Sequence, residues 1–250
     1  MLKEIKNLVA FLTIIPVGMD PDCLMDAADR MYLFPLVGAL IGLLAGLVAW
    51  ITLHILPSLI MGVLTLGILL AITGLHHTDG LLDFGDGIMF QGSPQKKIEI
   101  MHDQQTGAGG LVLGLVTLLT TAFCIANLSM SIIVQSLIVS EISAKLAMVI
   151  TAWTGKSTHK GMNTYFVNAM HAKFRNLRLI AALTCSVGIT TSLLRFAGLT
   201  ATIAGLVAAL AMIGISNRHF KGVTGDVMGA VNELARMTSL ITVLVTLQWV

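Results

Sequence analysis

The chain consists mainly of long runs of apolar residues separated by short polar segments. Seven of these runs approach the roughly 20 residues that a helix needs to cross the hydrocarbon core of a bilayer. They occupy residues 31–53, 58–75, 110–127, 131–153, 179–194, 199–215 and 237–250. The pattern predicts an all-α, polytopic integral membrane protein with about seven transmembrane helices, which form a single domain over residues 1–250.

The segment at residues 1–14 differs from these runs because it is amphipathic. Its apolar residues recur at helical spacing, Lys3, Glu4 and Lys6 lie on the opposite face, and Pro16 follows. Such a segment is typical of a helix that lies in the membrane interface. A short signal sequence is the alternative, but no cleavage site of small residues follows the segment.

Composition also favours an integral membrane protein. Hydrophobic residues make up 56% of the 250 positions and charged residues only 11%, whereas soluble domains contain about 45–50% apolar and about 25% charged residues. Soluble, disordered, fibrous, disulfide-stapled and nucleic-acid-binding proteins are thereby excluded. The cysteines Cys23, Cys124 and Cys185 are far apart and form no CxxC motif, so they indicate neither a metal knuckle nor a redox pair.

Basic residues are distributed unevenly between the two sides that these spans define. The connections after the first, third and fifth spans contain Arg195 as their only basic residue, and no acidic one. The other side carries thirteen basic residues: Lys3, Lys6, Arg30, Lys96, Lys97, Lys156, Lys160, Lys173, Arg175, Arg178, Arg218, Lys221 and Arg236. By the positive-inside rule, the N-terminus and the long polar loops are predicted to face the cytoplasm. The active face is therefore expected to be cytoplasmic.

The most informative segment is residues 73–87, with the sequence TGLHHTDGLLDFGDG, which continues directly from the second apolar run. Asp79, Asp83 and Asp86 are spaced i, i+4, i+7, which places them on one face of a helix at the membrane surface. Their mutual repulsion is costly where water is scarce, and a divalent cation such as Mg²⁺ or Mn²⁺ would offset it. The alternative is a solvated acidic helix end, which the scarcity of neighbouring Lys and Arg disfavours.

Two histidines precede the aspartates. Consecutive residues on a helix diverge by about 100°, so at most one of His76 and His77 is expected to face the aspartate row. His77 could orient a carboxylate, bind phosphate or accept a proton near neutral pH. A hydrogen-bonded structural histidine is the alternative for either residue.

A second polar segment occupies residues 93–110. Ser93 and Pro94 predict the start of a short helix, and Asp103 precedes a glycine-rich turn that contains Gly107 and Gly110. Backbone N–H groups in such a turn can approach a phosphate at a helix start, although glycine-rich turns are also common without this function.

The remaining polar positions lie near the cytoplasmic side or inside the fourth span. Residues 153–178 form a basic connection that includes Lys160, and it is either ordinary positive-inside charge or a landing surface for an anionic substrate or lipid headgroups. Glu141 and Lys145 are spaced i, i+4 within the fourth span. A structural ion pair explains them, although Lys145 could also reach a phosphate.

A third polar block precedes the last span. It contains Lys221, Thr224, Gly225 and Asp226, with Glu233 two helical turns after Asp226. Asp226 and Glu233 share a helix face and offer further oxygen ligands on the same side of the membrane as the aspartate row.

Together these segments resemble the cobalamin-5′-phosphate synthase family, whose members are also called adenosylcobinamide-GDP ribazoletransferases. The resemblance extends over nearly the whole chain and rests on residues 34–38, 73–87, 100–110 and 222–233. The chain departs from the family pattern at His102, Gln104, Arg236 and Lys145, where the family has Arg, Ser, Glu and Arg.

The resemblance implies a Mg²⁺-dependent enzyme of a prokaryotic cell membrane that joins adenosylcobinamide-GDP to α-ribazole, or to its 5′-phosphate, and releases GMP. The catalytic residues are then expected to be His77, Asp79, Asp83, Asp86 and Asp103. The expected metal ligands are Asp79, Asp83, Asp86, Asp226 and Glu233. The expected substrate-binding residues are Lys145, Lys160, Gly107, Gly110, Thr224, Gly225 and Lys221.

Two other functions compete with this one. A CDP-alcohol phosphotransferase of lipid headgroup synthesis would have Ala-Arg after its Asp-Gly, whereas Leu81 and Leu82 follow Asp79-Gly80 here. A cation-coupled transporter would typically contain internal repeats, and the sequence has no convincing repeat. The stripe of Gly38, Gly42 and Gly46 suits close helix contacts within the chain or in a homo-oligomer.

Overall fold

The computed structural model describes residues 2–18, 20–158 and 161–248, and the described part is helical. Its elements are α1 (Leu2–Leu12), α2 (Cys23–Asp29), a 3-10 turn η1 (Met31–Leu33), α3 (Phe34–Leu53), α4 (Ser58–Ile72), α5 (His76–Met89), α6 (Pro94–Met101), α7 (Ala108–Ala126), α8 (Ile133–Thr154), α9 (Met162–His171), α10 (Arg175–Phe220) and α11 (Gly225–Gln248). The only extended pairing among these residues is an isolated bridge between Ser157 and Val223. The predicted all-α fold is therefore confirmed.

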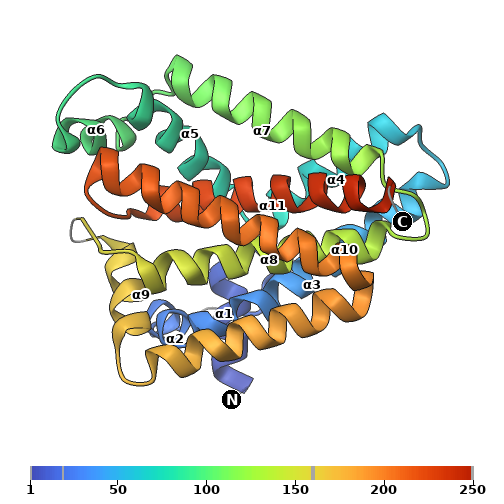
Figure 1. Ribbon diagram of the computed structural model, residues 1–250, viewed down its shortest axis with the longest axis horizontal. Helices are drawn as coiled ribbons and strands as arrows, with labels where there is room; N and C mark the ends of the chain where they lie inside the picture. The colour runs from blue at the N-terminus through green and yellow to red at the C-terminus, as the bar shows by residue number, and fades with distance from the viewer. Residues whose placement is uncertain (1, 19, 159–160, 249–250) are drawn as a thin grey trace.

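The longest element, α10, is a hairpin of two helices. The backbone leaves helical geometry at Leu194 and at Arg195, where φ is +50°, and the ribbon reverses direction there (Figure 1). The hairpin is closed by a 2.9 Å hydrogen bond from the Thr202 hydroxyl to that of Thr190. A side chain at Gly198 would collide with the carbonyl of Thr190, so glycine permits the close contact. The two halves contain the separately predicted runs 179–194 and 199–215.

Helix α8 occupies the centre of the bundle, with α3, α10 and α11 packed around it. Gly38, Gly42 and Gly46 of α3 lie against the α8 backbone near Glu141, Leu137 and Val134. Small residues allow this close approach of two helices. The glycine stripe is thus used within the chain.

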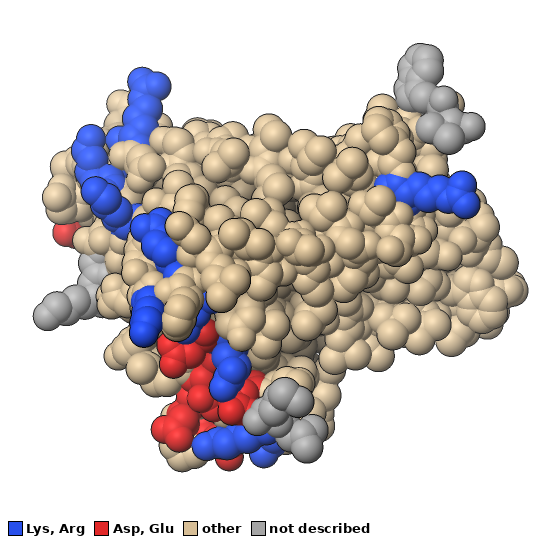
Figure 2. All heavy atoms as spheres, turned by 60° about the horizontal axis from the view of Figure 1, so that its bottom comes forward, with Lys and Arg blue, Asp and Glu red and all other residues tan. Residues whose placement is uncertain are grey.

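Apolar side chains cover the outside of the bundle. Exposed leucines, isoleucines and valines lie along α3, α4, α7 and the second half of α10, and the charged side chains visible in Figure 2 gather mainly at one end. Large exposed apolar areas mark contact with a membrane or a partner. By length and composition, five described helices could cross a membrane, or six if α4 and α5 together form one bent span.

The chain turns by 97° between α4 and α5. Gly74 and Leu75 both adopt the left-handed conformation there, with φ of +65° and +63°. The predicted second span therefore ends at Ile72, three residues before its expected boundary, and α5 leaves in a new direction. Helix α5 is too short and polar to be counted as a span by itself.

Helix α11 begins earlier than the sequence indicates. The last span was predicted to start at residue 237, whereas α11 starts at Gly225 and includes Asp226, Glu233 and Arg236. Arg236 was assigned to the cytoplasmic charges, but its side chain is fully buried between helices. That assignment is wrong because the charge of Arg236 is neutralised by partners inside the protein, which a hydropathy pattern does not reveal.

Helix α1 crosses the direction of the long helices (Figure 1) and packs on α2. Leu8 and Leu12 are buried, and Asn7 donates a 2.8 Å hydrogen bond to Asp26. The amphipathic prediction for this helix holds, and its apolar face contacts protein. Helices α2, α5, α6 and α9 lie at the same end of the bundle.

Candidate active site

Glycines bring the acidic helix α5 into backbone contact with α11. A Cβ atom at Gly80 would lie 2.9 Å from the Cα and carbonyl oxygen of Asp226, and one at Gly229 would lie 2.9 Å from the His77 carbonyl. Any larger side chain would force the two helices apart. This contact places the start of α11 directly beside the aspartate row.

The aspartates of the two helices form one electrostatic cluster. Burial, followed by the negative charges of Asp79, Asp226 and Asp86, raises the pKa of Asp83 to about 7. Like charges that share a site make ionisation of the last carboxylate unfavourable. We call Asp79, Asp83, Asp86 and Asp226 the acidic cluster, and a cation bound there would relieve their repulsion.

Asp86 has a structural partner within this cluster. Its two carboxylate oxygens accept hydrogen bonds from the backbone N–H groups of Gly107, at 2.7 Å, and Gly110, at 2.8 Å. A Cβ atom at Gly107 or Gly110 would lie 2.5 or 2.7 Å from the Asp86 oxygens, so both glycines are required for the contact. The glycine-rich turn was expected to bind a phosphate at the start of α7, whereas in the structure its N–H groups bind the carboxylate of Asp86.

The third polar block forms the start of α11. The Thr224 hydroxyl donates to Asp226 at 3.3 Å and accepts from the Val227 N–H at 3.2 Å. His102 Nε2 lies 3.9 Å from the Asp226 carboxylate. A Cβ atom at Gly225 would meet no atom within 4 Å, so open space adjoins this residue. These contacts hold the Asp226 side chain in place within the acidic cluster.

Two other predicted residues are not brought into the acidic cluster, and a third lies outside the described residues. Asp103 is exposed in the connection between α6 and α7, where it accepts from the Gln105 N–H at 3.2 Å. Lys221 is exposed at the end of α10. Lys160 lies outside the described residues.

His76 and His77 have different environments, as their helical spacing predicts. His77 is buried, and its Nδ1 atom has no hydrogen-bond partner among the described residues, whereas His76 is exposed. Burial, together with the positive charges of Lys145 and Arg236, holds the pKa of His77 well below its ordinary value. The imidazole is therefore neutral at physiological pH, and its protonated form is disfavoured.

A cavity of about 1140 Å³ opens beside these residues. Its polar wall contains His76, His77, Asp79, His102 and Asp226. Most of the other lining residues are apolar and include Phe11, Phe34, Met148, Met162, Phe166 and Met228. An apolar cavity with a few convergent polar groups is typical of a ligand-binding site.

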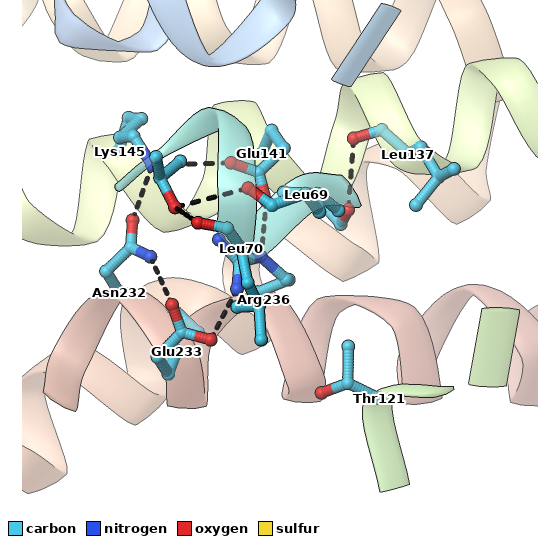
Figure 3. A network of polar contacts seen from close by, with 12 residues as sticks. Leu69, Leu70, Thr121, Leu137, Glu141, Lys145, Asn232, Glu233 and Arg236 are labelled. Carbon is cyan, nitrogen blue, oxygen red and sulfur yellow. Dashed lines mark hydrogen bonds and ion pairs between the residues drawn. The ribbon is translucent and has the colours of Figure 1, made fainter. Parts of the chain in front are cut away.

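A buried ion network connects α8 to α11 (Figure 3). Lys145 Nζ lies 3.3 Å from Glu141 and donates a 2.8 Å hydrogen bond to Asn232. Arg236 donates to both Glu141 and Glu233, and the Asn232 amide donates to Glu233 at 3.2 Å. All five side chains are at most 1% exposed.

This network changes the interpretation of two predicted residues. The Glu141–Lys145 ion pair is confirmed, and Lys145 is fully engaged within the protein. Both carboxylate oxygens of Glu233 are bonded by Asn232 and Arg236, so the structure assigns Glu233 to the network and not to the acidic cluster. The sequence hinted at this role only through the i, i+3 spacing of Glu233 and Arg236.

The acidic cluster suits Mg²⁺ binding in which the substrate supplies part of the coordination shell. Among the described residues, no three His, Cys, Asp or Glu side chains are arranged to enclose a metal ion. Mg²⁺ usually binds through one or two carboxylates, with water and substrate phosphates completing its octahedral shell. One or two of the carboxylates of Asp79, Asp83 and Asp226 suit this mode, in which the substrate would supply part of the metal site.

The fold and the site define a polytopic helical membrane protein with a carboxylate cluster at the wall of a large ligand cavity. A family model described as cobalamin-5-phosphate synthase matches residues 4–244. The chain therefore belongs to the cobalamin-5-phosphate synthase family. Membership of this family does not support the two alternative functions, a lipid headgroup transferase and a transporter.

Curated relatives carry the name adenosylcobinamide-GDP ribazoletransferase. The Methanococcoides burtonii relative is 34% identical over 98% of this chain and 93% of its own length. The relative from Methanocella arvoryzae is 36% identical, covering 96% of this chain and 94% of its own length. The Thermococcus kodakarensis relative is 33% identical, with 94% and 96% covered. No solved structure matches the chain.

Proposed function

We propose that this protein is a membrane-embedded transferase that moves the cobinamide phosphate moiety of adenosylcobinamide-GDP to α-ribazole and releases GMP. This is the reaction for which its relatives are named, a late step in assembly of the cobalamin nucleotide loop. The observation that carries the proposal is the acidic cluster, of which Asp79 and Asp226 line a cavity large enough for a nucleoside. Either α-ribazole or its 5′-phosphate can serve as the acceptor.

We base the proposed Mg²⁺ dependence on the acidic cluster. One or two of the carboxylates of Asp79, Asp83 and Asp226 would hold Mg²⁺, which when bound neutralises the diphosphate and stabilises the leaving GMP. Asp86 would act differently, because its oxygens already hold the start of α7 through Gly107 and Gly110. Its function is then to fix α5 against α7 and so to position the other aspartates.

The chemistry requires a hydroxyl of α-ribazole to attack the phosphorus that carries the cobinamide. A new P–O bond forms to this oxygen, the P–O bond to GMP breaks, and the hydroxyl proton must leave. His77 is suited to accept that proton because it is neutral and lies in the cavity wall. Neighbouring apolar side chains exclude water that would otherwise hydrolyse the activated corrinoid.

We also propose seven membrane crossings, with the polar end in the cytoplasm of a prokaryotic cell. Counting the two halves of α10 separately, and α4 as a span, gives seven apolar segments that agree with the predicted runs. The charge distribution supports this orientation, since basic residues predominate at the end that carries the active site. Helix α1 would lie in the cytoplasmic interface, across the direction of the spans.

Activity of the purified protein tests the proposal. The protein is incubated with adenosylcobinamide-GDP, α-ribazole and Mg²⁺, and both GMP release and product mass are measured. We expect an adenosylcobalamin product and its loss in Asp83→Asn. Glu99→Gln is a matched control, because Glu99 is an exposed acid of α6 paired with Lys96. Near wild-type turnover by Asp83→Asn would contradict the metal role, and no GMP release by the wild type would refute the function.

A further inference from the structure

The residues that line the cavity form two chemically different groups: polar groups that include Asp79 and Asp226, and a larger set of apolar side chains. We call the apolar side chains from α1, α3, α8 and α9 the apolar end, and they include three phenylalanine rings in mutual contact. Phe11 lies 5.2 Å from Phe166 and 6.3 Å from Phe34 between ring centroids, and Phe34 lies 5.9 Å from Phe166. We call this trio the phenylalanine cluster.

We propose that the phenylalanine cluster is the binding site for the aromatic base of the nucleoside acceptor, an inference that rests on the proposed function. Aromatic rings bind other planar aromatic rings through burial and through offset or edge-to-face contacts. Met148, Met162 and Met228 line the same cavity, and thioethers contact aromatic rings favourably. The acceptor carries a planar fused ring of this kind, whereas the phosphates of the donor require the acidic end.

Size and polarity favour the nucleoside over the corrinoid at this end. The whole cavity measures about 1140 Å³, and pockets of roughly 300–1,000 Å³ are typical of drug-sized ligands. A nucleoside fits such a space with its ribose directed toward His77 and Asp79. The much larger corrin ring, with its amide side chains and diphosphate, would occupy the open polar side.

Asn163 provides a polar group for the sugar. Its side chain lines the cavity and is 2% exposed, and Nδ2 donates to the Val223 carbonyl at 2.8 Å and to the Ser157 hydroxyl at 3.0 Å. Those bonds fix the amide, and Oδ1 remains without a partner among the described residues. A buried unsatisfied acceptor is costly, and a ribose hydroxyl would satisfy it.

Acceptor selectivity tests the assignment. The ratio of kcat/KM for α-ribazole to kcat/KM for imidazole riboside, which lacks the fused benzene ring, is measured with adenosylcobinamide-GDP at saturation. The change Phe166→Leu keeps the site apolar but removes a ring. Phe84→Leu is the control, because Phe84 is equally buried, contacts Phe220 and does not line the cavity.

We expect Phe166→Leu to reduce this ratio about 3- to 10-fold, the range expected for loss of one aromatic contact, and to leave the KM for adenosylcobinamide-GDP within about 2-fold. Phe84→Leu should leave the ratio unchanged. An unchanged ratio in Phe166→Leu, or a raised KM for the corrinoid alone, would overturn the assignment while the transferase function stands. A wild type that releases no GMP with either nucleoside would instead refute the proposed function, and the assignment with it.

Discussion

The buried ion network gives the sharpest stability prediction. Glu141 accepts contacts from both Lys145 and Arg236, and all of these side chains are sealed from solvent between α8 and α11. The network contains two cations and two anions, with Glu233 as the second anion, so it is neutral as a whole. The change Glu141→Gln preserves the side-chain volume but leaves two buried cations with one carboxylate.

The expected magnitude follows from the loss of charge balance. Removal of one partner from a buried ion pair costs about 3–5 kcal/mol, because the remaining charge is left uncompensated. We therefore expect Glu141→Gln and Lys145→Met each to destabilise the protein by about 3–5 kcal/mol. The double variant removes one charge of each sign and keeps the Glu233–Arg236 pair, so it should cost at least about 2 kcal/mol less than the sum of the single changes.

Unfolding of the purified protein in detergent measures these free energies, with the double-mutant cycle giving the coupling. Lys96→Gln is the control, because its pair with Glu99 is exposed and is expected to contribute less than about 1 kcal/mol. If the two single changes are additive, or if each costs no more than Lys96→Gln, charge balance does not stabilise the network and the reasoning is refuted.

Three further predictions concern the acidic cluster. Gly80→Ala should destabilise the folded protein by about 1–3 kcal/mol and lower its affinity for Mn²⁺, because the new methyl group would press on the backbone of Asp226. An unchanged free energy of unfolding together with an unchanged Mn²⁺ titration would contradict the contact. Gly107→Ala should lower activity by displacing Asp86, and a kcat equal to the wild type would count against that positioning role. Because the metal-free pKa of Asp83 is raised to about 7, Mg²⁺ binding should release a proton below that pH. The apparent Mg²⁺ affinity in calorimetry should therefore rise with pH up to about 7 and then level off, whereas a flat profile from pH 5 to 8 would oppose it.

The helical membrane fold could be predicted from the sequence because apolar run length is a local property. The i, i+4, i+7 spacing of Asp79, Asp83 and Asp86 likewise predicted a shared face, and the charges of Asp79 and Asp86 both raise the pKa of Asp83. These features needed no knowledge of which helices are neighbours.

The parts that sequence could not supply depend on contacts between distant segments. Asp86 bonds the start of α7, so its partners could not be inferred from the spacing of α5 alone. Arg236 resembled a cytoplasmic charge because its partner Glu141 lies on another helix. The contact of Gly80 with Asp226 joins two segments whose proximity no local pattern specifies.

Binding of Mn²⁺ to the purified protein, measured by electron paramagnetic resonance with and without adenosylcobinamide-GDP, tests the central claim most directly. We expect the wild type to bind the ion more tightly when the diphosphate is present, and Asp83→Asn and Asp226→Asn to lose most of that binding. Glu99→Gln should bind as the wild type does. Wild-type affinity in both aspartate variants would contradict a metal site in the acidic cluster.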